Sequence, residues 1–144
     1  MDSSPTLGTR VEQDRPPTVH DVMRPAVTTV ERQAHLAAVA FMMHRAGDSA
    51  VVITAGPQNP QPVAVVTESD ITTTVAEGRD VNEVRIGELI GKEPVTIGPD
   101  ATVAAAAELM LSRGVHHLPV VEGDRLVGIV DIADTCRAFL GQVA

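Results

Sequence analysis

Two pairs of polar residues give the clearest indication of a functional site in this chain, and the two members of each pair are three positions apart. Thr67 and Asp70 form one pair, and Asp131 and Asp134 form the other. Each pair follows an apolar run and opens a helical pattern, which is the spacing of a helix N-cap with a carboxylate in the first turn. A helix N-terminus also offers polar groups to a ligand. Capping alone and ligand binding therefore stay open as alternatives for both pairs.

Two adjacent histidines, His116 and His117, are the second candidate group. They alternate on a predicted strand, so one faces a cleft while the other is solvated or packed. Neither has a further ligand at metal-site spacing, and we expect no metal site. The sequence shows no serine, histidine and aspartate in a catalytic order, no glycine-rich phosphate loop and no pair of catalytic carboxylates. We therefore expect no enzyme.

These residues belong to a unit that occurs twice in the chain. Apolar residues with the i, i+3, i+4, i+7 spacing of a buried helix face occur in both halves, as Leu36, Val39, Ala40 and Met43 and again as Val103, Ala106, Ala107 and Met110. Gly47 and Gly114 follow these helices as predicted C-caps. The stretch 63–70 likewise matches 127–134. An internal repeat of helix, strand, strand and helix follows from this.

A short helix and a short strand are predicted before these four elements, so the predicted order in each copy is helix, strand, helix, strand, strand, helix. The first copy, residues 18–78, has these elements at 18–23, 27–30, 36–46, 49–54, 63–66 and 68–77, with a long exposed hairpin loop at 56–62. The second copy, residues 85–144, has them at 86–90, 95–97, 102–113, 118–121, 126–130 and 132–140, with a turn at 122–125. Residues 79–84 are expected to link the copies, and residues 1–17 to form a disordered tail.

The bulk composition narrows the classes of function. A chain of 144 residues with 44% hydrophobic content predicts one compact domain. The formal net charge of −8 and the lack of a Lys/Arg cluster argue against nucleic acid and against an anionic membrane surface. The single cysteine, Cys136, excludes an intrachain disulfide, and the chain has no signal pattern or spanning apolar run. We expect a soluble, cytoplasmic protein.

Two such copies, each ending in small-apolar-apolar-[Thr/Ser/Asp]-x-x-Asp, resemble a pair of CBS (cystathionine β-synthase) domains. The resemblance covers residues 18 to about 140 and is carried in order by 21–23, 27–30, 99–103, 116–121 and 126–130. It implies an α+β fold in which two pseudo-symmetric repeats pack sheet to sheet, and pairs that commonly dimerise. It also implies that adenine-containing ligands bind in clefts between the repeats. Since no effector domain is attached, the chain resembles the stand-alone members.

The resemblance further implies roles for the polar pairs. Asp70 and Asp134 would hold ribose hydroxyls, and Thr67 would meet the ribose or phosphate. His116, with His117 beside it, would point toward phosphate. Asp131 departs from the family pattern, because a carboxylate at this position repels phosphate, so that cleft is expected to be empty or to prefer an uncharged or cationic adenosine compound. The remaining ligand-binding positions that we assign are Thr28, Ser49, Ala50 and Val95.

We therefore expect a regulatory sensor that binds AMP, ATP or a related adenosine compound. Apolar helix faces, at Ile132, Cys136, Phe139 and Leu140 and at Ile71 and Val75, predict a homodimer. The alternative is a ligand-free CBS-pair interaction module whose surfaces dock a partner protein. A small hydrolase is the third hypothesis, and the lack of an assembled catalytic group counts against it.

Overall fold

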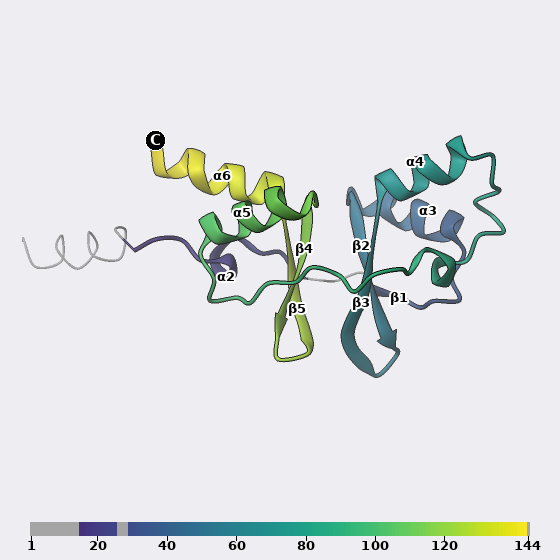
Figure 1. Ribbon diagram of the computed structural model, residues 1–144, viewed down its shortest axis with the longest axis horizontal. Helices are drawn as coiled ribbons and strands as arrows, with labels where there is room; N and C mark the ends of the chain where they lie inside the picture. The colour runs from purple at the N-terminus through teal and green to yellow at the C-terminus, as the bar shows by residue number, and fades with distance from the viewer. Residues whose placement is uncertain (1–14, 26–28, 144) are drawn as a thin grey trace, which may run out of the picture.

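The computed structural model describes residues 15–25 and 29–143, and this part of the chain forms two halves that lie side by side (Figure 1). The half drawn on the right holds β1 (Thr29–Val30), α3 (Leu36–Ala46), β2 (Ala50–Gly56), β3 (Asn59–Thr67) and α4 (Glu68–Ala76). The left half holds α5 (Val103–Arg113), β4 (His117–Glu122), β5 (Arg125–Asp131) and α6 (Ile132–Val143). The predicted tail lies outside the described residues up to residue 14.

The two halves meet through their sheets, as predicted. The first sheet has the order β1-β2-β3, with β1 parallel to β2 and β3 antiparallel to it, and the second is the antiparallel pair β4-β5. Ala50, Val52 and Ile129 are buried together between the sheets, with Val65 and Leu126 packed against them. Figure 1 shows β3 and β5 facing one another, with the helices on the outside. The α+β fold of two sheet-packed repeats is confirmed.

The long helices form where the repeat predicts them. In α3 the buried side chains are Leu36, Val39 and Met43, and in α5 they are Val103, Ala106 and Met110. Both helices end at a glycine in the left-handed conformation, with φ of 71° at Gly47 and 66° at Gly114. A residue with a Cβ is strained in this conformation, so glycine ends the helix at the least cost.

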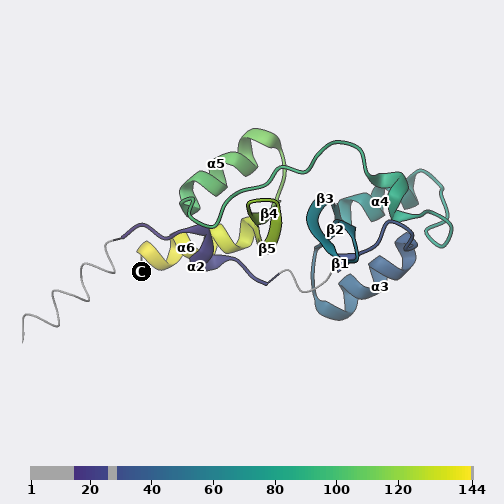
Figure 2. The ribbon, with the colours of Figure 1, turned by 90° about the horizontal axis from the view of Figure 1, so that it is seen from below.

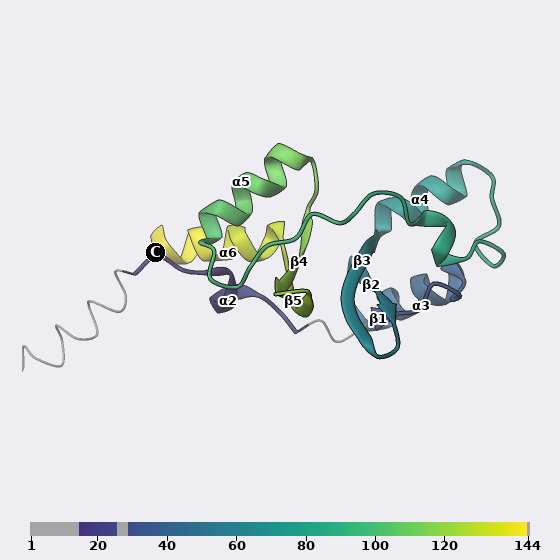
Figure 3. The ribbon, with the colours of Figure 1, turned by 60° about the horizontal axis from the view of Figure 1, so that its bottom comes forward.

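The short first helix of each sequence copy packs on the half that the other copy forms, not on its own. Helix α2 (Val19–Val22) lies against α5 and α6 in the second half (Figures 2 and 3). Val19 is fully buried there, and its N–H donates to the carbonyl of Ala101 at 2.8 Å. The 3₁₀ helix η1 (Ile86–Leu89) packs on the first half, where the Ile86 N–H donates to the carbonyl of Ala34 at 2.8 Å. Each half therefore completes its core with a helix from the other copy.

Two local predictions were wrong. The stretch 56–62 is not a long loop, because β3 begins at Asn59, which pairs with Gly56, and Pro62 pairs with Thr54. The prolines are accommodated because β3 is an edge strand and its pairing with β2 shifts register on both sides of Thr54. The predicted strand at 95–97 is reduced to one parallel bridge between Ile97 and Val120.

Candidate functional site

Two cavities lie between the halves, and we call them the smaller and the larger cleft. The smaller cleft has a volume of about 440 Å³ and is lined by Arg24, Pro25, Ala46, Asp48, Ser49, Ala50, Val51, Val52, His117 and Ile129. The larger cleft has a volume of about 1060 Å³, and its wall includes Ser49, Thr67, Asp70, Lys92, Val95, Arg113, His116, His117 and Asp131. Ser49 and His117 border both clefts.

The larger cleft contains a helix cap with one carboxylate oxygen left over. Thr67 caps α4, and its Oγ1 accepts a hydrogen bond from the Asp70 N–H at 3.4 Å. In return, the N–H and Oγ1 of Thr67 donate to Oδ2 of Asp70 at 2.7 and 3.2 Å. No described residue donates to Oδ1 of Asp70, and the side chain is partly exposed. The cap therefore holds the carboxylate in place while one oxygen stays available to a ligand.

The rest of the larger cleft combines aliphatic walls with charged side chains at its rim. Val65, Val95, Val115 and Ile132 contribute apolar surface. The exposed basic side chains on the wall are Lys92, Arg113 and His116, and the acidic ones are Glu68 and Glu93. Aliphatic side chains of this kind can pack against a planar ring, and Oδ1 of Asp70 can accept a hydrogen bond from a hydroxyl group.

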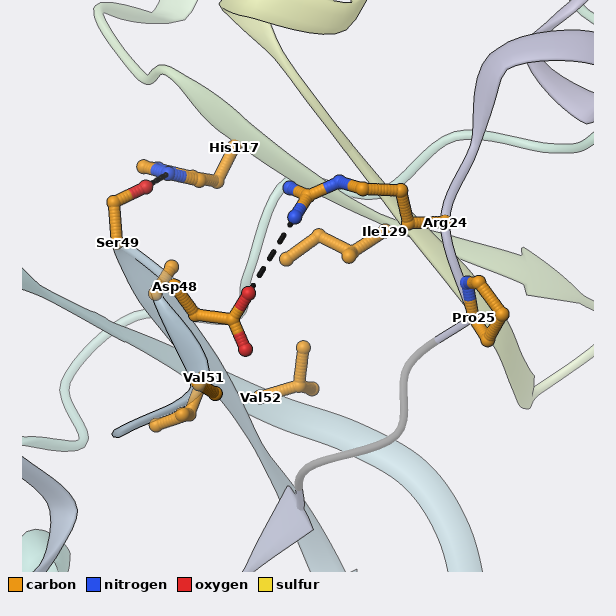
Figure 4. A pocket seen from close by; sticks show the side chains of 10 residues that line it. Arg24, Pro25, Asp48, Ser49, Val51, Val52, His117 and Ile129 are labelled. Carbon is orange, nitrogen blue, oxygen red and sulfur yellow. Dashed lines mark hydrogen bonds and ion pairs between the residues drawn. The ribbon is translucent and has the colours of Figure 1, made fainter. Parts of the chain in front are cut away.

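The smaller cleft is dominated by Arg24, which lies just after α2 and pairs with carboxylates of both halves. Its Nη2 donates to Oδ2 of Asp131 at 2.8 Å, and its Nε lies 3.4 Å from Oδ2 of Asp134. Its Nη1 lies 3.5 Å from Oδ1 of Asp48, the contact drawn in Figure 4. Asp131 and Asp134 belong to the second half and Asp48 to the first, so one guanidinium bridges the two halves.

The carboxylates behind Arg24 are engaged on all sides. The Asp131 N–H donates to Oδ2 of Asp134 at 2.9 Å, and the Asp134 N–H donates to Oδ1 of Asp131 at 2.8 Å. Oδ1 of Asp134 accepts from Arg137 at 2.6 Å, and Asp134 is only 4% exposed. Burial raises the pKa of Asp131, but hydrogen bonding with Asp134 and the charge of Arg24 outweigh it and hold the pKa below its usual value.

A hydrogen bond between Ser49 Oγ and His117 Nε2, 2.8 Å long, joins the two halves at the border of the clefts (Figure 4). Burial lowers the pKa of His117, with the Asp131 charge opposing this shift. A serine bonded to a neutral histidine is the start of a nucleophilic triad, which also requires a carboxylate that orients the ring. The oxygens of Asp131 bond instead to Arg24 and Asp134, and no other described carboxylate bonds to His117. The bond therefore serves as a link between the halves.

The structure brings most of the predicted site residues together. Ser49, Ala50, Thr67, Asp70, Val95, His116, His117 and Asp131 all line one cleft or both. Asp134 lies behind Arg24 and lines neither cleft in the described part of the chain. Thr28 lies outside the described residues. The Thr67–Asp70 pair of the first copy faces His116 and Val95 of the second, so the larger cleft draws on both copies.

Six charged residues that line the clefts were missed, namely Arg24, Asp48, Glu68, Lys92, Glu93 and Arg113. The sequence holds one signal for two of them, because Arg24 and Lys92 each stand three residues before a valine, Val27 or Val95, that opens a predicted strand. Arg24 pairs with Asp131 at 2.8 Å, so the negative charge of this carboxylate is balanced within the chain.

Two searches of the described residues bear on the classes of function. None of their helices is long and apolar enough to cross a membrane. Among the same residues, no group of three or more His, Cys, Asp or Glu side chains has the arrangement of a metal site.

Comparison with known proteins supports the repeat. A CBS domain-containing protein of Bacillus subtilis (strain 168) is 30% identical over 119 residues, which cover 81% of this chain and 81% of that protein. The chain spans only 59% and 56% of the length of two further relatives, from Methanopyrus kandleri and Arabidopsis thaliana. A solved CBS domain protein from Pyrobaculum aerophilum, complexed with AMP, has a TM-score of 0.77 and 28% identity, covering 88% of this chain and 98% of that one.

The family model of the CBS domain matches twice, over residues 19–77 and 86–141. These ranges agree with the two copies of the internal repeat and together span most of the 144 residues. The duplicated motif, the sheet-to-sheet packing and the clefts between the halves all agree with this match. This chain belongs to the CBS domain family and carries two CBS domains in tandem.

Proposed function

We propose that this chain is a regulatory module that binds an adenosine-type ligand, such as AMP or ATP, in a cleft between its two CBS repeats. The observation that carries the proposal is the Asp70 carboxylate in the wall of the larger cleft, which the Thr67 cap fixes through Oδ2 while Oδ1 accepts no hydrogen bond from a described residue. A ribose diol needs an acceptor of this kind, and the aliphatic walls suit an adenine ring. The AMP complex of the Pyrobaculum aerophilum relative is in line with this choice of ligand.

The composition makes a direct test possible. The chain has no Trp or Tyr and only two Phe, so the protein itself absorbs very little near 280 nm. Adenine absorbs strongly near 260 nm, and a bound nucleotide would dominate the spectrum. We expect an adenine-like band in freshly purified, nuclease-treated protein, lost after unfolding and dialysis.

Weaker binding calls for a second measurement and a control. If the ligand is lost during purification, millimolar AMP or ATP should still raise the melting temperature, because a ligand that binds the native state stabilises it. Asp70→Ala should weaken binding by about 1–3 kcal/mol, as expected for a hydrogen bond to a charged group, and so reduce either signal. If the protein shows no absorbance band near 260 nm and AMP, ATP and adenosine leave its melting temperature unchanged, the sensor proposal is refuted.

The alternative is an interaction module whose clefts stay empty. The smaller cleft favours it, because Arg24 in its wall is already paired with three carboxylates of the same chain. In both cases we propose a cytoplasmic, non-enzymatic homodimer. Exposed apolar side chains on α4 and α6 support the dimer, with Val75 60% and Leu140 69% exposed.

A further inference from the structure

We propose that the contact between the two halves is a proton-sensitive switch, in which protonation of His117 favours an arrangement with the halves moved apart. The inference goes beyond the proposed function, because its effector is a proton and no nucleotide takes part. Three features support it. Each half has a core of its own, few polar contacts join the halves, and one of those contacts includes a titratable ring.

The packing inside each half is more extensive than the packing between them. Leu36 and Ile53 are fully buried in the core of the first half, and Leu118 and Val130 in the core of the second. Between the sheets the buried residues form a smaller cluster, which consists of Ala50, Val52 and Ile129. Movement of one half against the other therefore disturbs little of either core, and such movements are a common form of conformational switch.

Within the described part of the chain, two polar side-chain contacts cross between the halves, and both end on neighbouring residues of the first half (Figure 4). Arg24 lies 3.5 Å from Asp48, and these side chains are 41% and 27% exposed. Water screens an ion pair of this length and exposure, so it holds the halves weakly. Ser49 Oγ and His117 Nε2 are 2.8 Å apart and partly buried. The hydrogen bond of His117 is therefore the firmer of the two contacts.

A proton on His117 is poorly accommodated while the halves are in contact. Burial of the ring holds the pKa of His117 below its ordinary value. The charged and titratable side chains around the ring come from both halves and are Asp131, His116 and Arg24 of the second half and Glu68 and Asp48 of the first. Asp131, whose charge opposes the effect of burial, already pairs with Arg24 at 2.8 Å. A proton on the ring therefore adds net positive charge to the contact.

Separation of the halves exposes the ring, because His117 lines both clefts between them. In the separated arrangement the pKa of His117 is close to that of an exposed histidine, about 6.5, and is higher than in the closed arrangement. The separated arrangement therefore binds the proton more readily and gains population as the pH falls below about 6.5. Because one proton is taken up, the ratio of separated to closed molecules rises by at most about tenfold per pH unit.

A distance measurement between the halves provides the test. Spin labels are attached to Thr73→Cys on α4 and Ser112→Cys on α5, both at exposed positions, in a protein that also carries Cys136→Ser. The labelled protein is mixed with an excess of unlabelled Cys136→Ser protein, so that the distances measured lie within one chain. Pulsed electron paramagnetic resonance records these distances in steps from pH 8 to pH 5 without nucleotide. Circular dichroism defines the pH range over which the protein is folded.

We expect a single distance at pH 8 and a second distance that appears as the pH falls, with a share that follows the one-proton limit. His117→Gln keeps a neutral side chain that can bond to Ser49, so it should abolish the response to pH. His116→Gln, at the adjacent exposed histidine, is the matched control and should keep the response. If His117→Gln does not fold, the midpoint of the distance change must coincide with the titration of the His117 ring, followed by nuclear magnetic resonance.

The inference is overturned if the folded protein shows the same distances at every pH. It is also overturned if His117→Gln responds to pH as the natural residue does, if His116→Gln abolishes the response, or if the ring titrates at a pH different from the midpoint of the distance change. None of these results touches the proposed function, because nucleotide binding is measured separately at neutral pH. Failure to bind AMP, ATP or adenosine likewise leaves the proton-sensitive switch standing.

Discussion

Ser49 of the first repeat and His117 of the second are joined by a hydrogen bond of 2.8 Å, and both residues border both clefts. Ser49 precedes β2, and His117 opens β4, so the bond ties the starts of two strands that belong to different sheets. A ligand that reaches Ser49 or His117 in one cleft therefore contacts residues that also form the wall of the other cleft. The bond also depends on the protonation state of His117, and this makes it testable by pH.

We expect His117 to make the protein less stable in mild acid. Burial lowers the pKa of His117, so the folded protein binds a proton less readily than the unfolded chain, where the pKa of histidine is about 6.5. Above that pH the residue is neutral in both states and adds no pH dependence. As the pH falls below it, the unfolded chain takes up the proton first and the free energy of unfolding decreases, until the pH passes the folded pKa.

The measurement compares His117→Gln with the natural protein in urea unfolding between pH 7 and pH 5. The variant keeps every other histidine, so the difference between the two proteins in how the free energy of unfolding changes with pH reports His117 alone. The charged and titratable groups near its ring are Asp131, His116, Arg24 and Glu68. If the free energy of unfolding changes with pH equally in the two proteins, His117 does not contribute to the loss of stability in acid.

Arg24 should matter more for stability than Arg137, although both pair with Asp134. Arg24→Ala removes a cation shared by three carboxylates, two of them largely buried, and only Asp134 keeps another partner, Arg137. The substitution should lower the free energy of unfolding by about 1–3 kcal/mol. Arg137 is 67% exposed, and its pair is worth about 0–1 kcal/mol. Chemical denaturation of both variants at neutral pH checks the order, and equal losses would contradict it.

Gly128 should not tolerate a side chain. A Cβ at this position would lie 2.9 Å from the Arg24 carbonyl oxygen and 2.8 Å from the Met23 sulfur. The Met23 side chain can move, but the Arg24 backbone is paired with Ile129 through two hydrogen bonds of 2.9 Å. Gly128→Ala should therefore cost about 1–3 kcal/mol of stability, as for other overpacked sites.

Gly141 provides the matched control for this substitution. It lies in α6, and nothing is within 4 Å of a Cβ added there. Alanine is the better helix former, so Gly141→Ala should leave the melting temperature unchanged or slightly higher. If Gly128→Ala melts at the same temperature as Gly141→Ala, the close approach of the Arg24 segment does not constrain the fold.

The oligomeric state should be a dimer that depends on the outer helices. Val75 on α4 and Phe139 and Leu140 on α6 are 60%, 37% and 69% exposed. Light scattering at micromolar concentration should give about twice the chain mass of 15.1 kDa. Val75→Asp with Leu140→Asp should shift the mass to that of one chain, because a charge opposes burial of the face. A monomer mass for the natural protein would end the dimer proposal.

Many local features of the fold could be predicted from the sequence, because the forces that determine them act over a few residues. The spacing of Leu36, Val39 and Met43 requires a helix with one buried face, whatever that face contacts. Gly47 ends that helix because of its own backbone freedom, and Thr67 begins the next because its hydroxyl reaches the Asp70 N–H. The second copy repeats these signals, so the repeat and its caps were predicted together.

The tertiary structure alone decided which residues share a cleft. Arg24 stands 107 positions before Asp131, and only the exchange of α2 onto the second half brings them within 2.8 Å. No local signal encodes that exchange, since α2 has one fully buried residue, Val19, and the surface that buries it is formed by residues far along the chain. The charge at Asp131 could be read in the sequence, but its effect on the cleft depends on a cation that folding places beside it.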